Sequence, residues 1–299
     1  MALPVAVAFT VGIWLLCGLT VQHWWVQFGC FAVTTYLMVE LNNQNALIRI
    51  YSRMVSCAFL LLSCAACFLM PSVRGGFLQL FVAAAYLVLF QTYQDKTSVG
   101  KTYYAFLFLG LASMANVHIL YFLPFFWLLM STNLLSLSWR TWSASLLGLL
   151  TPYWFGCAWL VYQADYTLLT THFTQLADFA FPVNYARLSI GFMTVLALLL
   201  ATTLTGIVHY LRKSYNDKIR IRMLFGFFIW MDLLAIVFMV IQPQHQDLLF
   251  RMMIINTSPL IAHFLALTST RFTNMAFYII SLATLLVMAY NVWTTSFLF

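Results

Sequence analysis

The sequence predicts an all-α fold, a polytopic transmembrane helical bundle of about 11 spans in which residues 1–299 form a single integral membrane domain. Of the 299 residues, 64% are hydrophobic and only 7% are charged, whereas about a quarter of the residues in a soluble domain carry charge. Apolar stretches of about 20 residues, the length that crosses a bilayer, follow one another along almost the whole chain. The sequence is therefore typical of a protein folded in lipid.

The individual elements follow from the behaviour of the backbone in lipid. Backbone polar groups in a bilayer have no water to bond, so each apolar run is expected to be a helix. The weakest boundary is "ANVHILYFLP", which must make a tight turn between the fifth and sixth spans. The expected spans are 3–21, 23–40, 51–70, 77–93, 102–117, 119–136, 142–163, 188–211, 222–242, 250–268 and 272–293.

The basic residues predict how these spans are oriented. Of the 14 Lys and Arg residues, only Arg74, Arg187 and Arg251 fall in the odd-numbered loops, and the other eleven fall in the even-numbered ones. Basic loops mark the cytoplasmic side, so the N-terminus is expected in the cytoplasm. The net charge of +7 is then a feature of topology, and no nucleic-acid partner is expected.

The one long loop on the predicted outer face is "ADYTLLTTHFTQLADFAFPVNYAR", residues 164–187. Leucine and phenylalanine recur in it at nearly helical spacing, and Asp165 is placed to cap a helix start. A short helix over 165–180, lying in the outer interface, is therefore expected.

One acid lies in the middle of an apolar run, Asp232 in "IWMDLLAIV". A charge at that depth costs at least ~2.5–3.5 kcal/mol, so the side chain should face protein. The next span runs in the opposite direction and carries His263, which predicts an intramembrane polar pair between Asp232 and His263. Such a pair is either a clamp between two helices or part of an ion-coupled transport path.

Other polar side chains gather on the predicted outer face. Arginine holds phosphate through two parallel hydrogen bonds, and a carboxylate beside it serves as a base. No two histidines have a compact metal-binding spacing, so no metal site is expected, and the sequence indicates no cofactor. The candidates for lipid-phosphate binding are Arg187, Arg251 and His245, and weaker candidates for a catalytic carboxylate are Asp165, Asp178 and Asp247.

Several segments resemble a known family. "NNQNALIRIYSRM", "YQDK", "FLFLGLASMANVHILYFLPFFWLLM", "SWRTWSASLLGLLTPYWF" and the later "IINTSPLIAHFLAL" are similar to an uncharacterised family of multispanning inner-membrane proteins of Bacteroidota. The similarity covers about three-quarters of the chain. It implies a location and no reaction.

A looser likeness connects the "GLAS…LP" helix pair and "GLLTPYWF" with the membrane core of C-type glycosyltransferases. That likeness implies work on polyprenyl-phosphate-linked glycans at the outer face. Those enzymes carry a catalytic acid in a long first outer loop, whereas the loop here is "VQHWW" and holds none. Either another outer carboxylate replaces it, or the chain binds such a lipid without catalysing.

Three functions remain open at this point. The first is handling of lipid-linked glycans, which predicts an outer cavity lined by Arg187, Arg251 and a carboxylate. The second is a structural or assembly subunit of an envelope complex, which predicts an apolar stripe for a partner helix. The third is a transporter or flippase, which predicts a polar path through Asp232. Membrane lipids are expected partners in each case.

Overall fold

The computed structural model describes residues 2–163, 167–177, 189–268 and 270–296. This part of the chain is all-α and contains no β-strand, as the sequence predicts. The α-helices are α1 (Ala2–Leu16), α2 (Trp25–Asn45), α3 (Met54–Ala65), α4 (Val73–Leu89), α5 (Val99–Ala115), α6 (Leu123–Thr132), α7 (Trp139–Gln163), α8 (Thr167–Thr174), α9 (Ile190–Lys213), α10 (Ile219–Ile241), α11 (Gln246–Ala266) and α12 (Arg271–Ser296).

Within the described residues, six helical stretches are long and apolar enough to cross a membrane. Three shorter apolar helices, Ala2–Leu16, Met54–Ala65 and Val117–Thr132, accompany them. The chain is thus a helical protein with the length and composition of a multispanning membrane protein. The six stretches are Val73–Thr92, Trp139–Tyr162, Ile190–Asn216, Ile219–Ile241, Pro243–Ala266 and Thr273–Thr294.

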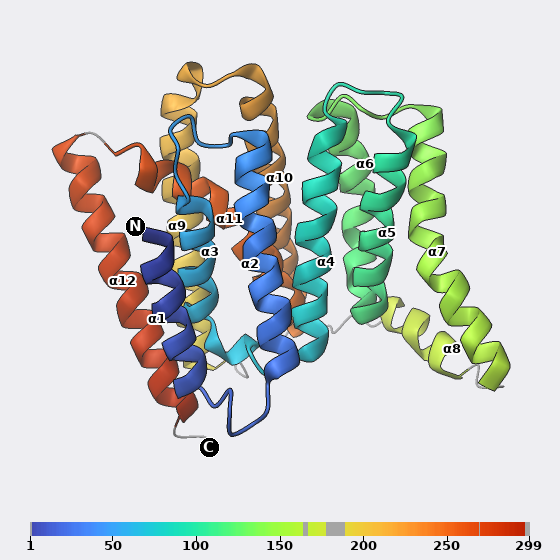
Figure 1. The fold of residues 1–299 in the computed structure, drawn as a ribbon, viewed down its shortest axis with the longest axis horizontal. Coiled ribbons are helices and arrows are strands. Elements are labelled where there is room, and N and C mark those ends of the chain that lie inside the picture. The colour runs from blue at the N-terminus through green and yellow to red at the C-terminus, as the bar shows by residue number, and fades with distance from the viewer. Residues whose placement is uncertain (1, 164–166, 178–188, 269, 297–299) are drawn as a thin grey trace.

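The long helices stand side by side and successive ones run in opposite directions, so their connections gather at two ends of the bundle (Figure 1). α8 lies obliquely at the lower end in that view, which we call the α8 end. α8 and the 3₁₀ turn Gln175–Ala177 occupy most of the segment expected to be a short helix over 165–180.

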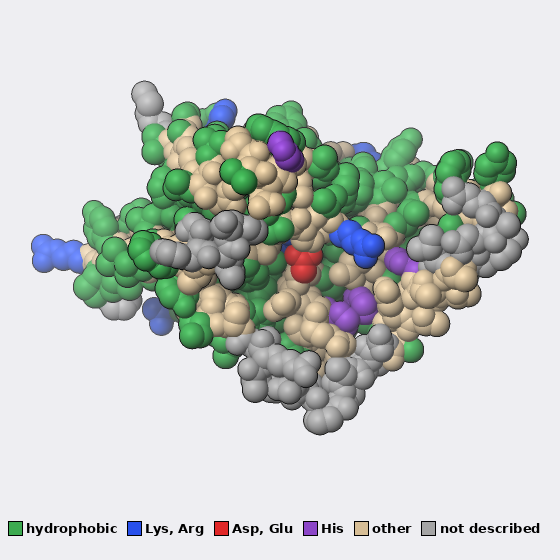
Figure 2. Space-filling view, turned by 90° about the horizontal axis from the view of Figure 1, so that it is seen from below, with side chains coloured by type: hydrophobic (Ala, Val, Ile, Leu, Met, Phe, Trp, Pro, Cys, Tyr) green, Lys and Arg blue, Asp and Glu red, His purple; other side chains and the backbone are tan. Residues whose placement is uncertain are grey.

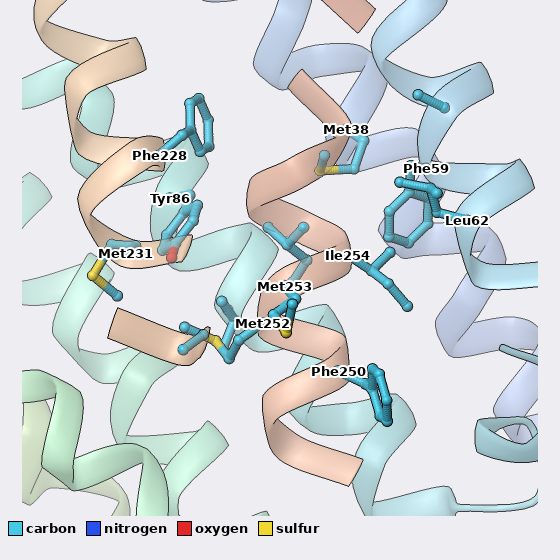
Figure 3. Packing of buried hydrophobic residues seen from close by; sticks show 14 of the residues in the cluster. Met38, Phe59, Leu62, Tyr86, Phe228, Met231, Phe250, Met252, Met253 and Ile254 are labelled. Carbon is cyan, nitrogen blue, oxygen red and sulfur yellow. The ribbon is translucent and has the colours of Figure 1, made fainter. Parts of the chain in front are cut away.

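α11 occupies the centre of the bundle. In its apolar window 94% of the residues are buried, against 17% for α12 and 22% for α7. It packs against α3, α9, α10 and α4. Figure 3 shows its Phe250, Met252, Met253 and Ile254 surrounded by side chains from other helices. α11 is therefore enclosed by its neighbours, and its polar side chains Arg251, Asn256 and His263 are buried with it.

The turn at "ANVHILYFLP" is tight, as expected. α5 ends at Ala115, and the chain reverses at Asn116 into a 3₁₀ helix, Val117–Phe122, which leads into α6. The Asn116 side chain stabilises the reversal because its Oδ1 accepts a hydrogen bond of 3.1 Å from the backbone N–H of His118. This turn places His118 at the α8 end, where the candidate site lies.

Candidate functional site

A polar cleft of about 550 Å³ opens at the α8 end. It is formed by the N-terminus of α4, the turn after α5, the α8 segment and the start of α11. Figure 2 looks onto this end, where acidic, basic and histidine side chains meet near the middle of the face. The lining residues are Ser72, Arg74, Gly75, Met114, Ala115, Asn116, Val117, His118, Thr171, His172, Gln175, Gln244, His245, Gln246, Asp247 and Leu248.

Arg74 supplies a positive charge to this cleft. It lies in the first turn of α4 and is exposed, and it makes no side-chain hydrogen bond or ion pair with any residue in the described part of the chain. The N-termini of α4 and α11 also open onto the cleft. A helix N-terminus carries about half a positive charge, so these ends add to the field of the guanidinium.

The histidines of the cleft are held in place by neighbouring groups. The rings of His118 and His245 stack with centroids 3.6 Å apart. His118 Nδ1 lies 2.9 Å from Asn116 Oδ1, and its Nε2 lies 3.0 Å from the carbonyl oxygen of Gln175. Asn116 Oδ1 also accepts from the backbone N–H of His118, so both ring nitrogens of His118 lie against oxygen acceptors.

His172 differs from His118 in its electrostatics. Burial lowers the pKa of His172 below its ordinary value, and the nearby charge of Arg74 lowers it further. Its Nε2 lies 3.4 Å from the hydroxyl of Tyr153. His172 is therefore a neutral polar group at physiological pH, and the positive charge of this wall comes from Arg74.

Asp247 is the carboxylate of the cleft, and it is already paired. Its Oδ1 accepts a 3.0 Å bond from Arg251 Nε, and its Oδ2 accepts a 3.1 Å bond from the Ser72 hydroxyl. Ser72 also caps α4 by accepting from the N–H of Gly75. A side chain at Gly75 would collide with Arg251 and Asp247, so glycine there lets α4 and α11 approach. Asp247 therefore lies in the cleft, and its two oxygens hold the ends of α4 and α11 together.

The structure does not fit the expectation that Arg251 binds a lipid phosphate. The residue is only 5% exposed. Besides Asp247, it donates to Gln79 Oε1 at 2.9 Å and to the carbonyl oxygen of Leu69. With all three nitrogens engaged inside the bundle, its guanidinium has no free face toward the cleft.

Behind this ion pair lies a second, much smaller cavity of about 30 Å³. Three polar atoms without a hydrogen-bond partner belong to residues that line it, Trp14 Nε1, Ser63 Oγ and Gln79 Nε2. Arginine only donates, so the bond from Arg251 fixes the Gln79 amide with its N–H₂ group turned away from the ion pair. The space has the size and polarity that suit a buried water.

The expected pair of Asp232 and His263 is wrong. His263 Nε2 lies 3.1 Å from Asp217 Oδ2 and ties the connection after α9 to α11. Asp232 is instead hydrogen-bonded by Thr203 and Thr257. The reason is helix rise: Asp232 is level with Thr257 of α11, and His263 lies six residues farther along that helix. At 1.5 Å per residue this separates Asp232 and His263 in depth by about 9 Å.

The remaining sequence candidates are distributed as follows. His245, a candidate for lipid-phosphate binding, lines the cleft. Arg187, Asp165 and Asp178 lie outside the described residues. Among the residues that are described, no group of three or more His, Cys, Asp or Glu side chains could hold a metal ion.

Arg74 is the residue that sequence reasoning missed. In the sequence analysis it is only one of the three basic residues of the odd-numbered loops, although its position just after a Ser N-cap is visible in "PSVRGG". No family model, no curated protein and no solved structure matches this chain.

Proposed function

We propose that this chain is a multispanning membrane protein that binds the anionic headgroup of a phosphate-bearing lipid in the cleft at its α8 end. The observation that carries the proposal is Arg74, an exposed cation in a polar cleft of about 550 Å³ that forms no hydrogen bond or ion pair with the described residues. Arginine is suited to phosphate because its planar fork matches two phosphate oxygens. The N-termini of α4 and α11 add positive character to the same cleft.

The proposal includes an orientation. The described helices alternate in direction, with the 3₁₀ helix Val117–Phe122 and α6 serving as one pass, which agrees with 11 spans. Arg74 and Arg251 fall at the α8 end, while Arg49, Lys96 and Arg140 fall at the other. By the basic-loop rule the α8 end faces the outside of a bacterial inner membrane and the N-terminus is cytoplasmic.

The ligand class we favour is a polyprenyl-phosphate-linked glycan. The cleft is larger than a phosphate group requires, and its lining is rich in amides and hydroxyls, including Asn116, Thr171, Gln175 and Gln244. These groups both donate and accept hydrogen bonds, as recognition of sugar hydroxyls requires. Asp247, the described carboxylate of the cleft, is already bonded through both oxygens, so we propose binding rather than glycosyl transfer.

The test compares two ligands that differ only in charge. The purified protein in detergent is titrated with a polyprenyl phosphate and with the uncharged polyprenol of the same length, and binding is read by native mass spectrometry. Arg74→Gln is expected to weaken phosphate binding about tenfold or more, because a hydrogen bond to a charged group contributes about 1.5–3 kcal/mol. Polyprenol binding should not change.

Arg140→Gln is the matched control, since Arg140 is an exposed arginine at the opposite end of the bundle. It should bind both ligands as the unmodified protein does. Equal affinity of the unmodified protein for the phosphate and the alcohol would contradict the proposal. An equal loss in the Arg74→Gln and Arg140→Gln variants would show that the cleft is not the site.

A further inference from the structure

Three buried oxygens from three helices meet near the middle of the bundle. Asp232 of α10, Thr203 of α9 and Thr257 of α11 are 0%, 3% and 0% exposed. The Thr203 hydroxyl lies 2.8 Å from Asp232 Oδ2, the Thr257 hydroxyl lies 2.9 Å from the same oxygen, and the two hydroxyls lie 2.8 Å apart. The three atoms thus form a closed triangle.

The hydrogens available to this triangle can be counted. Separations of 2.8–2.9 Å are those of O–H···O hydrogen bonds, and each such bond needs one hydrogen between its oxygens. A threonine hydroxyl brings one hydrogen and an ionised carboxylate brings none. Three contacts therefore require three hydrogens, and the two threonines supply two of them.

The third hydrogen must come from Asp232. We infer that Asp232 is a proton-binding site inside the membrane, and that it is occupied in this structure. The neutral acid donates from Oδ2 to one threonine, that threonine donates to the other, and the second threonine donates back to Oδ2. Each of the three oxygens then gives one hydrogen bond and receives one.

The surroundings of the triangle agree with a neutral acid. In the described part of the chain, no cation forms an ion pair with Asp232. The other polar side chains close to it are Tyr86 of α4 and Asn256 of α11, and both are uncharged. Figure 3 shows Tyr86 beside Met231 and Phe228 of α10, in an otherwise apolar region. An ionised carboxylate at this depth would cost at least ~2.5–3.5 kcal/mol.

The second carboxyl oxygen, Asp232 Oδ1, also distinguishes a protonated Asp232 from an ionised one. It has no hydrogen-bond partner in the described part of the chain. An unpaired oxygen is much less costly on a neutral carboxylic acid than on a carboxylate, whose charge is shared by both oxygens. The unpaired Oδ1 is therefore expected for a protonated Asp232.

The ring has a structural consequence, because it joins α9, α10 and α11. Loss of the proton would remove one of three hydrogen bonds and leave a charge in apolar surroundings. Proton occupancy and the packing of these three helices are thus coupled. All three side chains are buried, so the site is closed in this conformation and is not an open ion path.

Infrared spectroscopy of the purified protein tests this inference at pH 7. A protonated carboxyl group has a C=O stretching band that is separate from the bands of carboxylates. The spectrum of the unmodified protein minus that of Asp232→Asn should contain this band, and ¹³C labelling of aspartate should shift it. Asp247→Asn is the control, since Asp247 is ion-paired, and it should retain the band.

Two further results decide the inference. If Asp232→Asn does not fold, the ¹³C shift in the unmodified protein still reveals a protonated aspartate, and its absence overturns the proposal. Thr203→Val should move the band to a new frequency by opening the ring, while Thr203→Ser should leave it near its original place. A difference spectrum containing only carboxylate bands at pH 7 would show that Asp232 is ionised and that the proton count is wrong.

Discussion

At the residue scale, Arg251 carries its charge almost fully buried and still finds an acceptor for each of its three nitrogens. A buried charge is tolerated only with such complete pairing. Arg251→Met should therefore lower the free energy of unfolding by about 3–5 kcal/mol, since Gln79 Oε1, the Leu69 carbonyl and Asp247 all lose their donor. Denaturant unfolding in detergent micelles, followed by tryptophan fluorescence, measures the loss.

Asp247→Asn is the comparison for that experiment. The Asp247 side chain is 37% exposed, so water replaces part of what it loses. An asparagine Oδ1 can also still accept from Arg251. Asp247→Asn should therefore lower the free energy of unfolding by less than half as much as Arg251→Met does. Equal costs would mean that the ion pair acts as one unit and that burial of the arginine has no separate role.

Single residues also show where sequence reasoning reaches its limit. That Asp232 must face protein followed from its apolar neighbours, and the structure has it fully buried. Its hydrogen-bond partners could not be predicted from the sequence, because they lie on helices whose relative depth depends on where each helix begins. Thr203 and Thr257 belong to runs that contain several hydroxyls, and nothing in the sequence distinguishes these two from the others.

At the element scale, α5 and α7 pack through glycines. A side chain at Gly148 would collide with the backbone carbonyl of Tyr103, and one at Gly110 would lie 2.7 Å from the carbonyl oxygen of Leu149. Small residues at membrane helix interfaces let two backbones approach closely, which increases van der Waals contact. This contact positions α7, whose C-terminal end leads toward α8 and the cleft.

Gly148→Ala should therefore destabilise the protein by about 1–3 kcal/mol, because α5 and α7 must separate to admit the methyl group. Thermal unfolding in detergent is the measurement. Gly29→Ala in α2 is the matched control, since a methyl group there meets nothing within 4 Å. It should be neutral or slightly stabilising, as alanine favours a helix over glycine. Similar losses in both variants would mean that close helix contact at Gly148 does not matter.

At the scale of the whole molecule, composition and apolar run length were enough to predict an all-α bundle, because lipid leaves the backbone few alternatives. The cleft was less accessible to prediction. Its walls come from residues 72–75, 114–118, 171–175 and 244–248, and only the packing of α4, α5, α8 and α11 brings them together. Sequence reasoning found His245 and Asp247 as polar residues of one face, and chose Arg251 over Arg74 because burial cannot be read from residue type.

The orientation of the whole bundle in the membrane can be tested by labelling single cysteines in intact bacteria. Val21, at the α8 end, is 75% exposed, and Tyr215, in the connection between α9 and α10 at the opposite end, is 73% exposed. In a Cys157→Ser background, a membrane-impermeant maleimide should label Val21→Cys directly. Tyr215→Cys should react only after permeabilisation, because its basic neighbours keep that loop in the cytoplasm.

The opposite labelling pattern would place the cleft on the cytoplasmic side. Phosphate recognition by Arg74 would survive that result, since it depends on the geometry of the cleft. A role on outer-face glycans would not survive, because its ligand would lie in the other leaflet. The labelling experiment therefore separates the chemistry of the cleft, which rests on Arg74 and the helix N-termini, from the compartment, which rests on the distribution of the 14 basic residues.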